Sequence, residues 1–173
     1  TLDADPLAFA TRADMTLGGT TDTLALALSD NERFVLGEAR NFNDGTTGHV
    51  RRPVLWTDGG GPTDIGDNGL VFTLISDINN DGDVVGTARV LGSPVEWHGY
   101  ARIGGTWMDI GGLGGNRTDA RAINNLGVVT GNTRDASNNN QAFVWSIATQ
   151  QVEALPLPIG FTSAVGNDIN DAG

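Results

Sequence analysis

The chain of 173 residues is long enough for one domain with a buried core or for one array of repeats. Because it has no cysteine, a disulfide framework, a thiolate metal site and a cysteine nucleophile are all excluded. Its net charge of −11 argues against nucleic acid and anionic lipid as partners, and no run of about 18 apolar residues is present to insert into a membrane.

The first residues contain neither an initiating methionine nor a signal peptide, which indicates a processed or truncated product. LAFATR at 7–12 and DMTLGG at 14–19 are similar to the third and fourth strands expected in later repeats. We therefore assign residues 1–16 to the end of a preceding repeat.

A motif of about ten residues recurs along the chain. DINNDGDVVG at 77–86 is matched by AINNLGVVTG at 122–131, which starts 45 residues later, and by DINDAG at 168–173. A divergent copy, LSDNERFVLG at 28–37, keeps the apolar pattern and the final glycine. Recurrence at a fixed spacing is the signature of a repeat architecture.

Two further landmarks recur in the same order. The first comprises RPVLW at 52–56, HGYAR at 98–102 and QAFVW at 141–145. The second comprises TDIG at 63–66, MDIGGLGG at 108–115 and EALPLP at 153–158. Together the landmarks divide the chain into repeat 1 at 17–66, repeat 2 at 67–115, repeat 3 at 116–160 and the start of repeat 4 at 161–173.

Each repeat contains four short β-like runs. In the third repeat they are RTDARAIN, GVVTGNT, NQAFVWSIA and QVEALPL, separated by turn residues and without helical periodicity. Four strands in about 45 residues are typical of a propeller blade. We therefore predict an all-β fold, a propeller-like array of four-stranded repeats that is a partial propeller or a fragment. A β-sandwich and a β-solenoid stay open as alternatives.

The landmarks resemble the HAF family of bacterial extracellular repeats. The similarity lies in LGG, in INN followed by glycine and two β-branched residues, and in AFVW at the position of the family's His-Ala-Phe box. The chain departs from this box, because Arg52 and Gln141 replace its histidine in two copies, and His98 is followed by Gly99 and Tyr100. The resemblance implies a secreted or surface-displayed β-repeat protein and carries over no catalytic residue.

The loop that begins at Asp77 is a candidate metal site. Asp77, Asn79, Asp81 and Asp83 stand at positions 1, 3, 5 and 7 of an EF-hand-like calcium loop, with Gly82 at position 6. Position 12 is alanine instead of glutamate, and the next repeat lacks three of the four oxygen ligands. We therefore expect a hairpin turn built on Asn-Asp-Gly, with calcium binding as the alternative and no other cofactor.

The aromatic residues fall into two groups. Trp56, Phe143 and Trp145 alternate with small or polar neighbours and are expected to lie in the core between repeats. Trp97 and Trp107 lie outside this pattern and are the better candidates for a platform that stacks on sugar rings.

Polar residues give no convergent catalytic set. Asp64 and Asp109 recur at matching positions, which predicts carboxylates that cap backbone N–H groups in turns. His98 stands beside Glu96 and Trp97 and suggests a general base held by a carboxylate, but a histidine near a strand end is more often solvated or hydrogen-bonded. We therefore predict that the chain is not an enzyme.

These observations favour a non-enzymatic structural or interaction repeat protein, located outside the cell or at the cell surface. Its expected partners are protein neighbours, in self-assembly or in a surface complex, or a glycan. Two alternatives stay open: a carbohydrate-binding module or glycan-active enzyme on a β-propeller, and a calcium-stabilised adhesin.

Repeat 4 contains only a first strand and its turn, which leaves an open strand edge. We expect a fragment of a longer array, or an assembly with neighbours, in preference to closure of a small ring within the chain. Closure would bring residues 7–12 close to residues 161–168.

Overall fold

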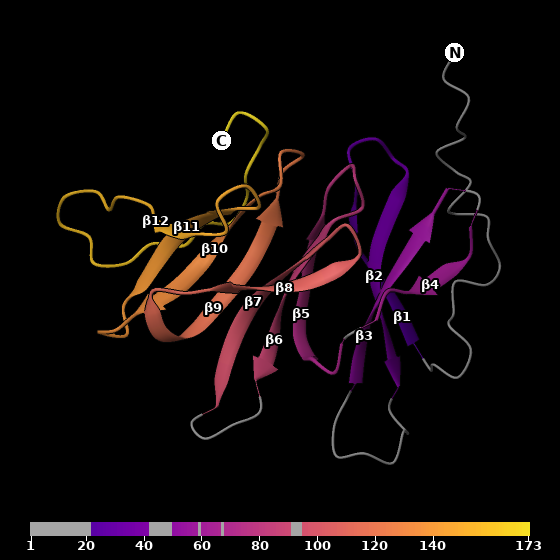
Figure 1. The fold of residues 1–173 in the computed structure, drawn as a ribbon, viewed down its shortest axis with the longest axis horizontal. Helices are drawn as coiled ribbons and strands as arrows, with labels where there is room; N and C mark the ends of the chain where they lie inside the picture. The colour runs from indigo at the N-terminus through magenta and orange to yellow at the C-terminus, as the bar shows by residue number, and fades with distance from the viewer. Residues whose placement is uncertain (1–21, 42–49, 59, 67, 91–94) are drawn as a thin grey trace.

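The computed structural model describes residues 22–41, 50–58, 60–66, 68–90 and 95–173 (Figure 1). All regular structure in these residues is β-strand, so the prediction of an all-β chain is confirmed for them. The described part therefore contains no helix of the length and apolarity needed to cross a membrane. The strand segments expected at 7–12 and 14–19, and with them the test of ring closure, lie outside the described residues.

The strands form three antiparallel meanders, which we call units 1, 2 and 3. Unit 1 consists of β1 (Asp22–Leu28), β2 (Phe34–Asn41), β3 (Val50–Thr57) and β4 (Pro62–Asp64). Unit 2 consists of β5 (Val71–Ile78), β6 (Val84–Val90), β7 (Glu96–Ile103) and β8 (Thr106–Gly111). Unit 3 consists of β9 (Gly114–Ile123), β10 (Val128–Asp135), β11 (Asn140–Ser146) and β12 (Val152–Ala154).

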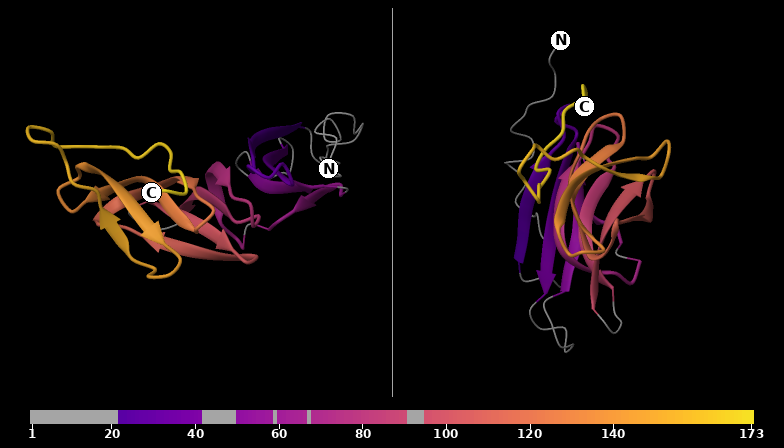
Figure 2. Two further views of the ribbon diagram at one scale, coloured as in Figure 1. Left: turned by 90° about the horizontal axis from the view of Figure 1, so that it is seen from above. Right: turned by 90° about the vertical axis from the view of Figure 1, so that its left-hand side faces the viewer.

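The units follow one another in chain order, as Figure 2 shows. β1 packs beside β5, and β5 beside β9, so the first strands of the three units are neighbours. A single parallel bridge between Trp97 and Arg117 joins units 2 and 3 into one continuous sheet. The turns that follow the three first strands lie at the same end of the molecule as the C-terminal residues (Figure 1).

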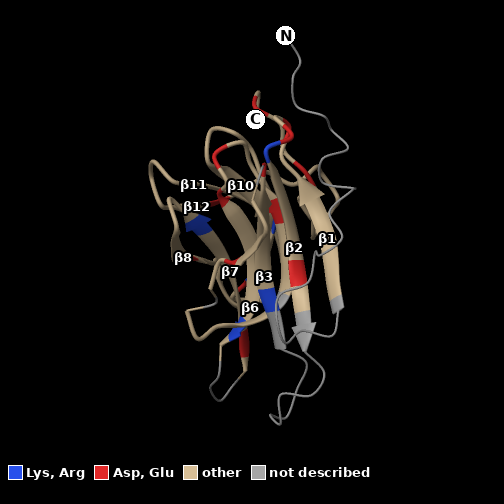
Figure 3. Cartoon of the chain, turned by 90° about the vertical axis from the view of Figure 1, so that its right-hand side faces the viewer, with Lys and Arg blue, Asp and Glu red and all other residues tan. Residues whose placement is uncertain are grey.

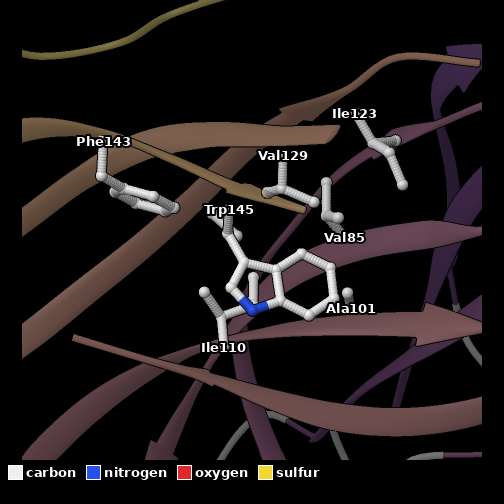
Figure 4. Close-up of a cluster of buried hydrophobic side chains, with 8 residues drawn as sticks. Val85, Ala101, Ile110, Ile123, Val129, Phe143 and Trp145 are labelled. Carbon is white, nitrogen blue, oxygen red and sulfur yellow. The ribbon is translucent and has the colours of Figure 1, made fainter. Parts of the chain in front are cut away.

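The core lies mainly between neighbouring units. One cluster joins Val85 and Ala101 of unit 2 to Val129 and Trp145 of unit 3, and the indole of Trp145 lies at its centre (Figure 4). A second cluster joins Leu36 of unit 1 to the apolar side chains of β5 and β6 in unit 2. Because buried apolar area stabilises by about 25 cal/mol per Å², each unit depends on its neighbour for much of its stability.

A glycine in each second strand allows a close approach to the first strand. Gly37, Gly86 and Gly131 occupy this position, next to a break in the register of the two strands. A Cβ atom at Gly131 would collide with the carbonyl oxygen of Asp119 and would lie 3.1 Å from the ring of Phe143. This explains why each recurring motif has a glycine at the same place.

Candidate functional site

The turn after each first strand is closed by the same kind of hydrogen bond. In unit 2 the side-chain oxygen of Asn79 accepts the backbone N–H groups of Asp81 and Asp83, both at 3.0 Å. In unit 3 Asn124 accepts two N–H groups in the same way, at 3.0 and 2.9 Å. Ser29 takes this place in unit 1, where its hydroxyl oxygen accepts an N–H across the turn at 3.1 Å. The first asparagine of the INN motif is therefore the residue that closes the turn.

Each turn also contains one residue in the left-handed backbone region. Its φ is 80° at Gly82, 71° at Gly127 and 91° at Gly173, a conformation that glycine adopts without steric cost. In unit 1 the same place is held by Glu32, whose φ is 59°. A residue with a Cβ atom is destabilised in this region by about 1–2 kcal/mol.

We expect Glu32→Gly to raise the free energy of unfolding by about 1 kcal/mol, because glycine relieves the strain while it also increases the entropy of the unfolded chain. Urea denaturation measures the change. The reciprocal variant Gly82→Ala is the control and is expected to lower stability by a similar amount. A loss of stability in Glu32→Gly would show that the side chain of Glu32 contributes more than the strain costs.

Further hydrogen bonds link each turn to the turn of the next unit. The backbone N–H of Asn31 donates to the side-chain oxygen of Asn80 at 2.8 Å, and the N–H of Asn80 donates to that of Asn125 at 2.9 Å. The N–H of Asn125 donates in turn to the carboxylate of Asp171 at 2.8 Å. The second asparagine of the INN motif therefore joins neighbouring units, and Asp171 supplies the same acceptor in the C-terminal turn.

A second set of bonds runs beside the first. The side-chain amide of Asn79 donates to the backbone oxygen of Asn124 at 3.3 Å. In the same way, the side-chain amide of Asn124 donates to the backbone oxygen of Asn170 at 3.0 Å. The side-chain amide of Asn125 also reaches Asp30 of unit 1 at 3.1 Å. We call these hydrogen bonds between turns the turn ladder.

The turns of the ladder surround a hollow of about 360 Å³, lined by the carboxylates of Asp30, Asp77, Asp168 and Asp171. Figure 3 shows acidic residues at the end of the molecule where the C-terminus lies. Burial raises the pKa of Asp77 above its ordinary value of 3.8, and the negative charges of Asp168 and Asp30 add to this effect. A hydrogen bond from the N–H of Ile123, at 2.9 Å, acts in the opposite direction and holds the carboxylate in place.

We expect Asp77→Asn to raise the melting temperature at neutral pH. Because the pKa of Asp77 is raised on folding, its ionisation destabilises the fold: stability is highest below about pH 3.8 and falls as the pH rises through the folded pKa. An asparagine oxygen still accepts the N–H of Ile123 and brings no charge. Melting curves at several pH values check this, and the advantage of the variant should vanish in acid. An equal gain at every pH would contradict the electrostatic cause.

The candidate calcium residues are engaged in this fold. Three of the four, Asp77, Asn79 and Asp83, accept backbone N–H groups, and the acceptor atom of Asp83 lies 2.9 Å from the nitrogen of Gly104. Asp81 is exposed at the tip of the turn. Among the described residues, no group of three or more histidine, cysteine, aspartate or glutamate side chains is arranged to hold a metal ion. Residues 77–83 form the hairpin that the Asn-Asp-Gly sequence predicts.

Asp64 and Asp109 fasten the third strand of a unit to the fourth. The carboxylate of Asp64 accepts a hydrogen bond from Arg52 at 2.8 Å, and that of Asp109 lies 2.6 Å from Nδ1 of His98. The other oxygen of each carboxylate accepts the backbone N–H two residues further on, at 2.9 and 2.8 Å. The expected capping of turns is observed, and each carboxylate also binds the first residue of the box.

His98 lies between two carboxylates. Nε2 is 3.1 Å from Glu96, so both ring nitrogens are engaged although 30% of the side chain is exposed. Partial burial lowers the pKa of His98, but the hydrogen bonds with Asp109 and Glu96 raise it by a larger amount. The pKa in the folded chain therefore lies above the ordinary value of 6.5. These residues and Trp97 line a hollow of about 390 Å³. Because carboxylates only accept hydrogen bonds, contacts at both nitrogens favour the protonated imidazolium, in which both nitrogens donate.

We expect the chain to lose stability as the pH rises from about 6.5, because a histidine whose pKa is raised on folding stabilises the fold fully only below its unfolded pKa. The loss continues until the pH exceeds the folded pKa. Urea midpoints measured between about pH 5.5 and about pH 8.5 check this prediction. His98→Gln is expected to flatten the profile, and a variant with the same slope as the wild type would assign the dependence to another group.

The structure separates the two tryptophans proposed as sugar platforms. Trp107 is half-buried: its ring lies 4.6 Å from that of Phe72, and its N–H donates to the backbone oxygen of Gly66 at 2.8 Å. Trp107 therefore fastens unit 2 to the end of unit 1, and its role as a sugar platform stays a prediction. Trp97 lines the hollow beside His98, and the guanidinium of Arg117 lies 5.5 Å from its ring centre.

No protein-family model matches the chain, and no curated protein matches it either. A solved structure assigned as TolB, from Agrobacterium tumefaciens, is similar, with a TM-score of 0.56 and 13% sequence identity. The match covers 83% of this chain and 50% of that one, so the chain spans about half the length of this neighbour. At this identity the likeness concerns the fold alone. The chain therefore has an all-β fold similar to part of a β-propeller.

Proposed function

We propose that the chain is a non-enzymatic structural or interaction repeat protein of the HAF type, a propeller-like array that acts outside the cell or at its surface. The turn ladder is the observation that carries the proposal. The most regularly recurring polar residues, the two asparagines of the INN motif, bond one unit to the next. Their recurrence is accounted for by assembly of the units, without any bound substrate.

The register of the strands supports the HAF type. Arg52, His98 and Gln141 each pair with the residue that stands two positions after the close-approach glycine of the second strand. The first residue of the box therefore has one structural position in all three units, as a repeat family requires.

The bonding of the box supports a non-enzymatic role. In unit 1 the cation of Arg52 holds Asp64 as His98 holds Asp109 in unit 2. Arginine is a poor general base at ordinary pH, yet Arg52 makes the same bond as His98. The role that the two residues share is therefore to join the third strand to the fourth.

An assay for turnover tests this proposal. We expect the purified chain to leave polysaccharides, esters and peptides unchanged, and His98→Gln and Glu96→Gln to behave like the wild type. Hydrolysis that is lost in His98→Gln would overturn the non-enzymatic role. Fractionation of the source cells tests the location, and recovery of the protein in the cytoplasm alone would contradict it.

Glycan binding is the second candidate, favoured by the hollow of about 390 Å³ beside Trp97. A glycan array tests it with two variants. Trp97→Ala should abolish binding, whereas Trp107→Ala, which changes a tryptophan outside the lining of this hollow, should retain it. Binding that survives Trp97→Ala would remove this candidate.

A further inference from the structure

The hollow beside Trp97 combines an aromatic ring with two carboxylates that solvent can reach. Trp97, Glu96 and Asp109 all line it, and the side chains of Glu96 and Asp109 are 42% and 43% exposed. The second oxygen of Glu96 accepts no hydrogen bond from the described residues, and each oxygen of Asp109 has one such contact with them. Because a carboxylate oxygen has two lone pairs, both groups can accept further hydrogen bonds from a ligand.

The corresponding place in unit 1 shows which group such a carboxylate binds. The register of the third and fourth strands makes Asp64 of unit 1 equivalent to Asp109 of unit 2. In unit 1 the guanidinium of Arg52 lies 2.8 Å from the carboxylate of Asp64. In unit 2 the shorter side chain of His98 takes the place of this arginine, and the hollow lies beside it. A carboxylate at this position therefore binds a guanidinium within the fold itself.

Unit 3 has no carboxylate at this position. Register places Ala154 there, and Gln141 stands where the other units have arginine and histidine. Within the described residues, unit 2 alone therefore combines the carboxylate with a histidine and a hollow beside them.

The indole of Trp97 also binds a guanidinium within the fold. The guanidinium of Arg117 lies 5.5 Å from the centre of its ring, and Asp119 holds this group with hydrogen bonds at 2.8 and 3.1 Å. Such a cation is attracted by the negative face of an aromatic ring. Arg117 is not among the residues that line the hollow, so Trp97 keeps surface there for a second contact.

We propose that this hollow binds the guanidinium group of an arginine side chain on a partner protein, in competition with the proton on His98. Glu96 and Asp109 accept the N–H groups of the guanidinium, and the indole of Trp97 packs against it. The net charge of −11 attracts a basic partner over longer distances. This inference rests on the proposed function as an interaction repeat protein and names the chemistry of its partner: a basic segment with an exposed arginine.

The competition follows from the contacts of His98. When protonated, its imidazolium donates to both carboxylates and adds a positive charge beside the hollow. The other charged groups nearby are Arg89 on β6 and Arg117 on β9, which both pair with Trp97. Arginine stays charged at ordinary pH, in the chain and in the ligand alike, so a rise of affinity with pH follows the loss of the proton from His98.

The probe is the peptide acetyl-Gly-Arg-Gly-amide, and the control peptide has uncharged citrulline in place of arginine. Added to the isotope-labelled 173-residue chain, the arginine peptide is expected to shift the NMR signals of the indole N–H of Trp97 and the backbone N–H of Gly111. The citrulline peptide should bind at least about tenfold more weakly, because it loses the charge-assisted hydrogen bonds. The affinity for arginine should rise severalfold between about pH 5.5 and about pH 8.5.

Asp109→Asn and Asp64→Asn form the matched pair of variants. Each removes one carboxylate from the same place in its unit, but Asp109 lines the hollow and Asp64 does not. Asp109→Asn should weaken binding about tenfold, whereas Asp64→Asn should bind like the wild type. Trp97→Ala should weaken binding about two- to fivefold. Circular dichroism confirms that the variants keep their strands before binding is compared.

His98→Gln tests the competition, because glutamine brings no proton that titrates in this range. It should bind the arginine peptide more tightly than the wild type at about pH 5.5, and its affinity should be nearly independent of pH. A pH dependence equal to that of the wild type would overturn the competition with His98.

Three results would overturn the site itself: equal binding of the two peptides, equal binding by Asp109→Asn and the wild type, or shifts centred on the hollow lined by Asp30 and Asp77. Glycan binding that needs Trp97, in a chain that ignores the arginine peptide, would assign the hollow to a glycan instead. Failure of the proposed function is distinguishable. Hydrolysis that is lost in His98→Gln would remove the proposed function even if arginine bound, whereas an inert chain that ignores both peptides would remove the guanidinium site alone.

Discussion

Trp145→Ala is expected to lower the free energy of unfolding by about 3–5 kcal/mol, the usual cost of truncating a fully buried tryptophan. The side chain is 1% exposed and lies among apolar residues from units 2 and 3, so the cavity opens at the seam between them. Chemical denaturation with fluorescence and circular dichroism detection measures the loss. Because neighbouring units share this cluster, both are expected to unfold at lower denaturant concentration.

Trp107→Ala is the natural comparison. Truncating a fully exposed tryptophan would cost little, but Trp107 packs on Phe72 and donates a hydrogen bond to Gly66. We expect an intermediate loss of stability, smaller than that of Trp145→Ala and larger than that of a surface substitution, which usually stays within about 0.5 kcal/mol. A loss as large as that of Trp145→Ala would place the main stabilising seam between units 1 and 2.

Gly131→Val is expected to destabilise the chain by about 3 kcal/mol or more, at the upper end of the range for overpacked sites. The first atom of the new side chain would collide with the backbone oxygen of Asp119, which cannot move without disturbing the pairing of β9 with β10. The ring of Phe143 blocks the other direction at 3.1 Å. Thermal and urea unfolding measure the loss.

Gly61→Ala is the control for a glycine with free space, because no atom lies within 4 Å of the Cβ position and its φ is not in the left-handed region. It is expected to be neutral or slightly stabilising, since alanine reduces the entropy of the unfolded chain. Equal losses in Gly131→Val and Gly61→Ala would mean that the close approach of the strands has no energetic importance.

Much of the fold could be predicted from local patterns. The alternating QAFVW run identified Trp145 as buried, and its counterpart Trp56 is also 1% exposed. Asn-Asp-Gly predicted the turn at 79–82, because glycine and asparagine have intrinsic preferences for that geometry. These features depend on residues close together in sequence, so a single sequence contains the information.

The seams between units could not be predicted in the same way. Trp107 donates its hydrogen bond to Gly66, 41 residues earlier, and nothing near Trp107 in the sequence indicates that partner. Register also places Arg102 where the other units have Trp56 and Trp145. Burial lowers the pKa of Arg102, and its buried Nε has no hydrogen-bond partner among the described residues. An arginine at a position that tryptophan holds in the other two units interrupts the apolar pattern from which a buried core is predicted.

The turn ladder lies between these cases. The spacing of the INN motif was visible, and hydrogen bonds such as that from Asn80 to Asn125 join residues 45 positions apart. The spacing therefore contained the signal for contacts between units. The sequence did not indicate that the two asparagines of the motif have different roles. A turn accounts for the first asparagine, which closes it, but does not require the second, which bonds to the neighbouring unit.

The ladder also bears on how such a chain can lengthen. Each turn presents donors to the following turn and acceptors to the preceding one, as Asn80 does with Asn125 and Asn31. A duplicated unit inserted between two existing units would meet the same complementary groups on both sides. Tandem duplication of whole units is therefore a conservative genetic change in this fold, whereas the loss of half a unit would interrupt the series of bonds.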